Sequence, residues 1–70
     1  MNTSRDAKLY YCYCSLHEAL LELYKVVWLI HEEEGGRSRE IAILSHSIVK
    51  IDELKLYYYL KVNDTEAQDE

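Results

Sequence analysis

The chain has no proline and no phenylalanine, and it contains only two glycines and three side-chain amides among its 70 residues. Because proline is absent, nothing except the pair Gly35-Gly36 would interrupt a long helix. With so few glycines, the chain has neither a phosphate-binding loop nor a dinucleotide fingerprint. A chain with almost no loop also has little material for a catalytic pocket. The sequence therefore predicts a protein that is not an enzyme, with no catalytic residues and no cofactor.

Cysteines and long apolar runs are also scarce. Cys12 and Cys14 are the only two cysteines. Two positions apart on a helix, they point about 200° away from each other, so they cannot form a disulfide together. The longest strictly aliphatic or aromatic runs, residues 26–30 and 56–60, are far shorter than the roughly 20 residues that span a bilayer. The first residues lack the apolar core of a signal peptide. These absences predict a cytoplasmic protein with no membrane partner.

Positive charge is in the minority. The formal net charge is −5, and residues 63–70 contribute four acidic side chains and no basic one. The rest of the chain is close to neutral and shows no broad basic stretch, which argues against binding of nucleic acid. Few amides together with many Glu, Lys and Arg are typical of proteins from thermophiles.

What the chain does have is a seven-residue apolar rhythm that is broken only at the glycine pair. On each side, apolar residues recur at alternating spacings of three and four, which predicts an all-α fold of two long helices in one antiparallel hairpin. The residues in this rhythm are Leu9, Tyr13, Leu16, Leu20, Leu23, Val27 and Ile30, then Ile41, Leu44, Ile48 and Ile51. We predict a helical hairpin over residues 1–62, with helices at about 4–34 and 38–62 and a turn at 35–37. A disordered acidic tail would follow at residues 63–70.

The rhythm also predicts how the two helices face each other. The facing pairs are Ile30 with Ile41, Val27 with Leu44, Leu23 with Ile48, Leu20 with Ile51, Leu16 with Leu56, and Tyr13 with Tyr58 or Tyr59. After Ile51 the next apolar residue is Leu54, a three-residue step that would locally overwind a coiled coil. At the turn, Ser38 is well placed to cap the second helix, and one glycine is expected to have a positive φ.

Helix 1 carries a second stripe, offset by one residue from the first and rich in Tyr, Trp and His. A helix that is apolar over so much of its circumference is buried on more than one side. Rings with an apolar body and a polar edge suit an interface. We therefore predict that two hairpins pair as a homodimeric four-helix bundle. The residues predicted at the dimer interface are Tyr10, Cys14, His17, Leu21, Tyr24 and Trp28.

Two groups of residues suggest other chemistry. Cys12, Cys14 and His17 resemble part of a metal or redox site, but a closed zinc site needs four ligands and Cys12 points elsewhere, so we predict no metal ligands. The tyrosines at 57–59 could stack on bases, as in an RNA-binding bundle of the Rop type. Such platforms accompany a basic groove, and only Lys55 and Lys61 flank these rings. RNA binding is therefore the alternative function, and metal binding or redox chemistry the third.

The segments Leu29-Ile30-His31-Glu32, Lys50-Ile51-Asp52-Glu53-Leu54 and Leu60-Lys61-Val62 resemble a small helical-hairpin protein of the Sulfolobus spindle-shaped viruses. The resemblance covers Leu16 to Val62. It implies a dimeric four-helix bundle that serves as an adaptor for an unidentified target. It also implies an archaeal virus as the source and the host cytoplasm as the location. The Tyr- and Cys-rich N-terminus and the acidic tail depart from that family.

Together these patterns predict a small non-enzymatic interaction protein of viral or plasmid origin. It would pair with itself and act as an adaptor or regulator that binds another protein.

Overall fold

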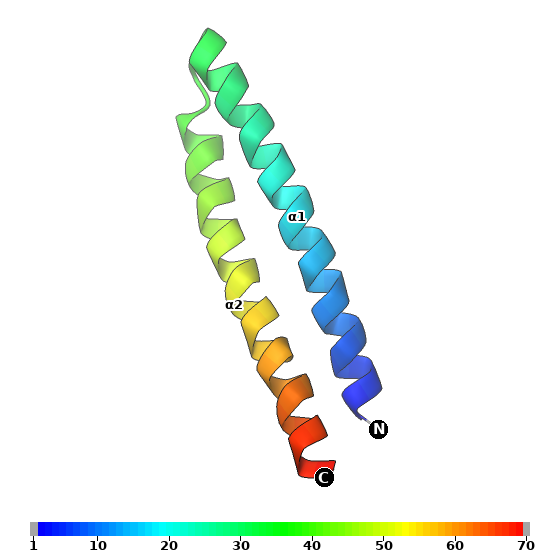
Figure 1. The fold of residues 1–70 in the computed structure, drawn as a ribbon. Coiled ribbons are helices and arrows are strands. Elements are labelled where there is room, and N and C mark those ends of the chain that lie inside the picture. The colour runs from blue at the N-terminus through cyan, green and yellow to red at the C-terminus, as the bar shows by residue number, and fades with distance from the viewer. Residues whose placement is uncertain (1, 70) are drawn as a thin grey trace.

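The computed structural model describes the backbone of residues 2–69 and the side chains of residues 4–63. Two helices, α1 (Asn2–Glu34) and α2 (Ser38–Asp69), lie side by side and antiparallel (Figure 1). The rod they form measures 55 × 14 × 13 Å, with both chain ends at one end and the turn at the other. Over the described residues there is no strand, and the predicted all-α helical hairpin is confirmed. Neither helix contains, within that part of the chain, a segment long and apolar enough to cross a membrane.

The glycine pair forms the turn, as predicted. Gly35 and Gly36 have φ angles of 74° and 78°, a region that favours glycine because it has no Cβ. The Gly35 N–H donates a hydrogen bond of 2.7 Å to the His31 carbonyl, which satisfies one of the open carbonyl groups at the end of α1. Both glycines, rather than the one expected, are left-handed.

The start of α2 differs in one detail from the prediction that Ser38 caps it. The carbonyl of Arg37 accepts the first helical hydrogen bond, from the Ile41 N–H at 2.9 Å, so Arg37 is the capping residue. The backbone N–H of Arg37 in turn donates to Nδ1 of His31 at 3.1 Å. A side chain from the end of α1 thus satisfies the backbone at the start of α2.

The two helices meet along a seam that keeps the seven-residue rhythm throughout. On α1 the buried or half-buried seam residues are Asp6, Tyr10, Tyr13, His17, Leu20, Tyr24, Val27 and His31. On α2 the half-buried seam residues are Arg37, Ile41, Leu44, Ile48, Ile51, Lys55, Tyr58 and Val62. Both sets follow spacings of four and three without a break. The predicted contact of Tyr13 with Tyr58 is confirmed, because their rings stack with centroids 5.6 Å apart.

The seam corrects two predictions. Leu16 and Leu23, expected to face α2, are 43% and 48% exposed, because the seam is turned toward Tyr10, His17 and Tyr24. The three-residue step after Ile51 is absent. Lys55 occupies the seam, and Leu54 is 38% exposed. The long aliphatic stem of a lysine can cover apolar neighbours while its ammonium stays in water, so Lys55 keeps the rhythm intact.

The second helix continues past the point where its end was predicted. It reaches Asp69, seven residues beyond Val62. The side chains of residues 64–70 lie outside the described part of the chain, so the disordered acidic tail predicted there stays a prediction.

Candidate interaction surfaces

An apolar flank lies on each side of the seam. Helical periodicity places side chains of both helices on each flank. The Leu23 flank comprises Leu9, Leu16, Leu23, Val26 and Ile30 of α1 with Ile43, Leu54 and Tyr57 of α2. The Trp28 flank comprises Leu21 and Trp28 of α1 with Val49, Leu56 and Tyr59 of α2. Two such surfaces on opposite sides distinguish this hairpin from a helix pair with a single apolar core.

On the Trp28 flank, the indole ring is held by its neighbours on α1. Tyr24 meets it edge-on with centroids 6.4 Å apart, and His31 does the same at 5.8 Å. His31 therefore links this ring to the turn, because its Nδ1 also binds the backbone of Arg37. Trp28 is nevertheless 41% exposed and Val49 is 53% exposed. The flank thus has a positioned and exposed aromatic ring at its surface.

On the Leu23 flank, the exposed surface is aliphatic. Leu23 and Val27 of α1 line a groove of about 180 Å³ with Ile43 and Leu44 of α2 and the stem of Glu40. Val26 is 51% exposed and Ile43 is 55% exposed beside it. This groove joins the two helices into one continuous apolar surface.

A polar layer crosses the seam between the two flanks. Nε2 of His17 lies 3.8 Å from Oδ1 of Asp52, and Nζ of Lys55 lies 3.9 Å from the same oxygen. Nearer the chain ends, the buried carboxylate of Asp6 lies 4.0 Å from Nζ of Lys61. Each contact joins α1 to α2 except the one from Lys55, which lies within α2. These pairs favour one register of the hairpin, because a shifted register would leave a half-buried charge without its partner.

Tyrosines from both helices gather at the open end of the hairpin. Tyr10 lies 5.5 Å from Tyr11 and 5.8 Å from Tyr59, measured between ring centroids, and these rings border a cavity of about 180 Å³. A hydrogen bond with Cys14, and to a lesser extent desolvation, raises the pKa of the Tyr10 phenol above its usual value. The ammonium of Lys61 lies 5.6 Å above the ring of Tyr57, but it also approaches Asp6. The cluster is aromatic without a basic groove beside it.

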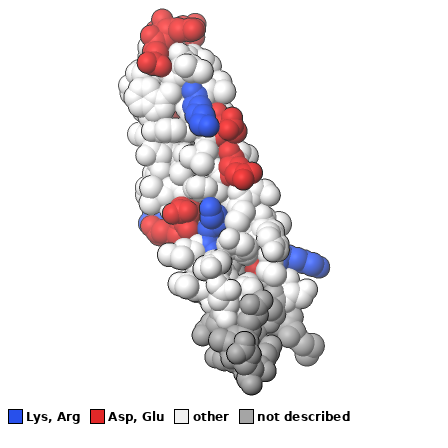
Figure 2. Space-filling model, viewed as in Figure 1, with Lys and Arg blue, Asp and Glu red and all other residues white. Residues whose placement is uncertain are grey.

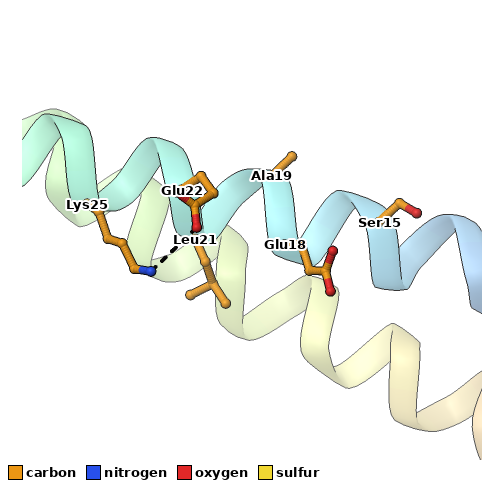
Figure 3. A pocket seen from close by; sticks show the side chains of 6 residues that line it. All are labelled: Ser15, Glu18, Ala19, Leu21, Glu22 and Lys25. Atoms are coloured by element: carbon orange, nitrogen blue, oxygen red, sulfur yellow. Dashed lines mark hydrogen bonds and ion pairs between the residues drawn. The ribbon is translucent and has the colours of Figure 1, made fainter.

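The outer face of α1 carries a shallow depression (Figure 3). Its six lining residues, Ser15, Glu18, Ala19, Leu21, Glu22 and Lys25, all come from this one helix, and Nζ of Lys25 lies 3.4 Å from Oε1 of Glu22. A single helix cannot surround a ligand, so this depression offers no enclosed site.

Charged side chains do not form one broad field on the face drawn in Figure 2. Acidic and basic groups occur there together in small groups, with uncharged surface between them. Among the described residues, several charged side chains pair with a residue three positions away, including Lys50 with Glu53 at 3.6 Å and Arg37 with Glu40 at 2.8 Å. This mixed pattern does not provide the extended positive surface that phosphate backbones require.

The residues predicted for the dimer interface do not share one surface in the structure. Tyr10, His17 and Tyr24 are half-buried on the seam inside one hairpin, whereas Leu21 and Trp28 are exposed on the Trp28 flank. Cys14 is half-buried and Cys12 is exposed. Among the described residues, no three His, Cys, Asp or Glu side chains are close enough to hold a metal ion.

The prediction from sequence missed the exposed part of the Leu23 flank as a candidate surface, because Leu16 and Leu23 were assigned to the seam. The signal that could have revealed it is a run of uncharged residues beside the first stripe, at Cys12, Ala19 and Val26.

Comparison with known proteins adds no family to these observations, because no protein-family model, no curated protein and no solved structure matches the chain.

Proposed function

We propose that this protein is a small non-enzymatic interaction module, a homodimeric four-helix bundle that binds another protein. One observation carries the proposal. Fourteen large apolar side chains are exposed, whereas Val27, at 5% exposure, is the one buried hydrophobic residue among the described side chains. Soluble monomers rarely expose apolar surface on this scale, and such patches mark sites of association.

Two flanks allow two kinds of association. A second hairpin packed on one flank completes a four-helix bundle and buries the apolar side chains of that flank. The other flank remains on the outside of that bundle. This surface is where the partner protein binds, in keeping with the adaptor role that the viral resemblance implies.

Dimerisation is tested by the mass in solution. Sedimentation equilibrium at micromolar concentration should give twice the chain mass of 8.3 kDa. A stable, folded monomer under these conditions would overturn the proposal.

Binding of a partner protein is tested with substitutions on the Trp28 flank. Val49→Glu and Leu56→Glu place a charge on the Trp28 flank, where they should abolish recovery of partner proteins from native host extract. His46→Glu is the matched control, since His46 is exposed on α2 but lies on neither flank. Equal recovery with all three variants would show that this flank binds no partner.

A further inference from the structure

The Leu23 flank has an order that the Trp28 flank lacks. Along α1 its residues continue for eight turns at spacings of four and three, alternating large and small side chains. The stripe reads Arg5, Leu9, Cys12, Leu16, Ala19, Leu23, Val26, Ile30 and Glu33. All of these residues are exposed except Leu9 and Ile30, which are half-buried. Between its two ends the stripe carries no charge.

The stripe is complementary to the same stripe on a second copy of α1 that runs antiparallel to the first. Leu9 then faces Ile30, Cys12 faces Val26, and Leu16 faces Leu23. The midpoint of each pair in the sequence is Ala19 or lies between Ala19 and the next residue. The charged ends also match, because Arg5 faces Glu33 only if the two copies run antiparallel. A parallel pair would place Arg5 beside Arg5 and Glu33 beside Glu33. The small side chain of Ala19 at the centre allows the two helices to approach closely.

The second helix has its own centre of symmetry at the same height. On the Leu23 flank of α2, Ile43 and Tyr57 lie at equal distances in sequence from Lys50, and Ser47 and Leu54 are centred within one residue of it. The axis brings Lys50 near its own copy, and Glu53 of the same helix, 3.6 Å from its ammonium, offsets that charge. The cross-seam contact of His17 with Asp52 shows that the middle of α1 lies level with this part of α2. A twofold axis across the flank must cut both helices at one level, and here it does.

We infer that the second copy of the chain docks on the Leu23 flank, with α1 antiparallel to α1 and α2 antiparallel to α2 about a twofold axis at Ala19. This assignment rests on the proposed dimer and names the surface that forms it. It differs from the interface predicted from sequence, since three of those residues lie on the seam. The Trp28 flank, with its positioned indole ring, is left for the partner protein.

Disulfide cross-linking tests the register. In the variant Cys14→Ser/Val26→Cys, the register places Cys12 beside the new thiol of the second copy. Within one chain these thiols are fourteen residues apart, about 21 Å along a helix, and a disulfide cannot span that distance. Mild oxidation should therefore give a covalent dimer on a non-reducing gel. Peptide mapping should place the bond between positions 12 and 26.

The matched control uses the opposite flank. Cys12→Ser/Trp28→Cys keeps Cys14 and also separates two thiols by fourteen residues, now on the Trp28 flank. It should stay uncross-linked. Two results would overturn our choice of flank and register: a cross-link in this control, or no cross-link in either variant. If sedimentation still gives a dimer in that case, the proposed dimer itself stands. A folded wild-type monomer would overturn both this inference and the proposed dimer.

Charge reversal tests the antiparallel direction by a separate route. Arg5→Glu places two acidic groups together at each end of the interface, so the dissociation constant of the dimer should rise by about threefold to tenfold. Arg5→Glu/Glu33→Arg should restore it. A negative charge near the start of a helix favours the helix itself, so weaker pairing of Arg5→Glu cannot be ascribed to unfolding of α1. An unchanged dissociation constant in Arg5→Glu would contradict the antiparallel contact.

Discussion

At the scale of single residues, His31 joins the end of α1 to the start of α2. Its carbonyl accepts the N–H of Gly35, just after the end of α1. Its Nδ1 accepts the backbone N–H of Arg37, which caps α2, and its ring contacts Trp28. In a capping box, a glutamate in the first turn of the same helix would reach back to that N–H. Here Glu40, which holds that position, instead binds the guanidinium of Arg37, and a histidine from the preceding helix replaces it.

We predict that His31→Phe lowers the free energy of unfolding by about 1–2 kcal/mol, because it keeps an aromatic ring beside Trp28 but leaves a part-buried N–H without its acceptor. Urea denaturation followed by circular dichroism measures the change. His46→Phe is the control and should change the stability by less than about 0.5 kcal/mol, since His46 is exposed. Equal effects of the two substitutions would show that the hydrogen bond to Arg37 contributes nothing.

Lys55 interrupts the apolar pattern of the seam on α2, between Ile51 and Tyr58. Its side chain is 27% exposed and its ammonium lies 3.9 Å from Asp52, which is itself largely exposed. We predict that Lys55→Leu raises the free energy of unfolding by about 1 kcal/mol, because it adds apolar burial and loses only a weak ion pair. Thermal denaturation measures this. A lower melting temperature would mean that the polar layer around Asp52 stabilises the hairpin.

At the scale of the elements, the turn is set by backbone conformation rather than by packing. A Cβ added at Gly35 or Gly36 would meet no atom within 4 Å, so a larger residue would fit without a clash. The difficulty is the positive φ at both positions. The glycines therefore separate the two helices, because glycine adopts the left-handed conformation of this turn without steric cost.

We predict that Gly35→Ala and Gly36→Ala each lower the stability of the hairpin by about 1–2 kcal/mol, the cost of a left-handed conformation for an L-residue. Replacing both lets the chain run on as one long helix, which changes the oligomer. Circular dichroism and sedimentation equilibrium follow the two effects. Gly36→Asn should be milder than Gly36→Ala, because asparagine tolerates this region. Unchanged stability and mass in the double variant would place the helix break elsewhere.

At the scale of the whole molecule, the hairpin is a thin rod that cannot cover its own apolar side chains. Two helices bury one stripe each against the other, and α1 and α2 both carry more than one stripe. Most of the surplus lies on two opposite flanks, whereas Tyr11, Leu29 and Leu60 are exposed on neither. In the proposed assembly a second hairpin covers one flank and a partner protein the other.

We predict that Leu23→Glu raises the dissociation constant of the dimer at least a hundredfold, whereas Trp28→Glu leaves it within about threefold. In the inferred dimer Leu23 faces Leu16 of the second copy, so a buried carboxylate there would cost about 3 kcal/mol or more. The two side chains are similarly exposed in one hairpin, at 48% and 41%, which makes Trp28→Glu a matched control. Sedimentation equilibrium measures both. The opposite ranking would transfer the dimer interface to the Trp28 flank.

Much of the fold could be predicted from the sequence alone. The lack of proline, the single glycine pair and the apolar rhythm predict two helices, their meeting at Gly35-Gly36 and a contact of Tyr13 with Tyr58 or Tyr59, of which the structure shows Tyr58. These features depend on local conformation and on counting along the chain. Neither needs knowledge of what surrounds a given side chain.

The rotation of each helix about its own axis was decided only by the tertiary structure. Helix α1 carries two overlapping stripes of similar hydrophobicity, so its periodicity cannot tell whether Leu16 and Leu23 or Tyr10, His17 and Tyr24 face α2. The choice depends on partners from the other helix. Asp52 lies near His17, and Tyr59 lies near Tyr10. Such pairings between residues far apart in sequence leave no periodic signal, because a pattern along one helix does not record what the other helix places against it.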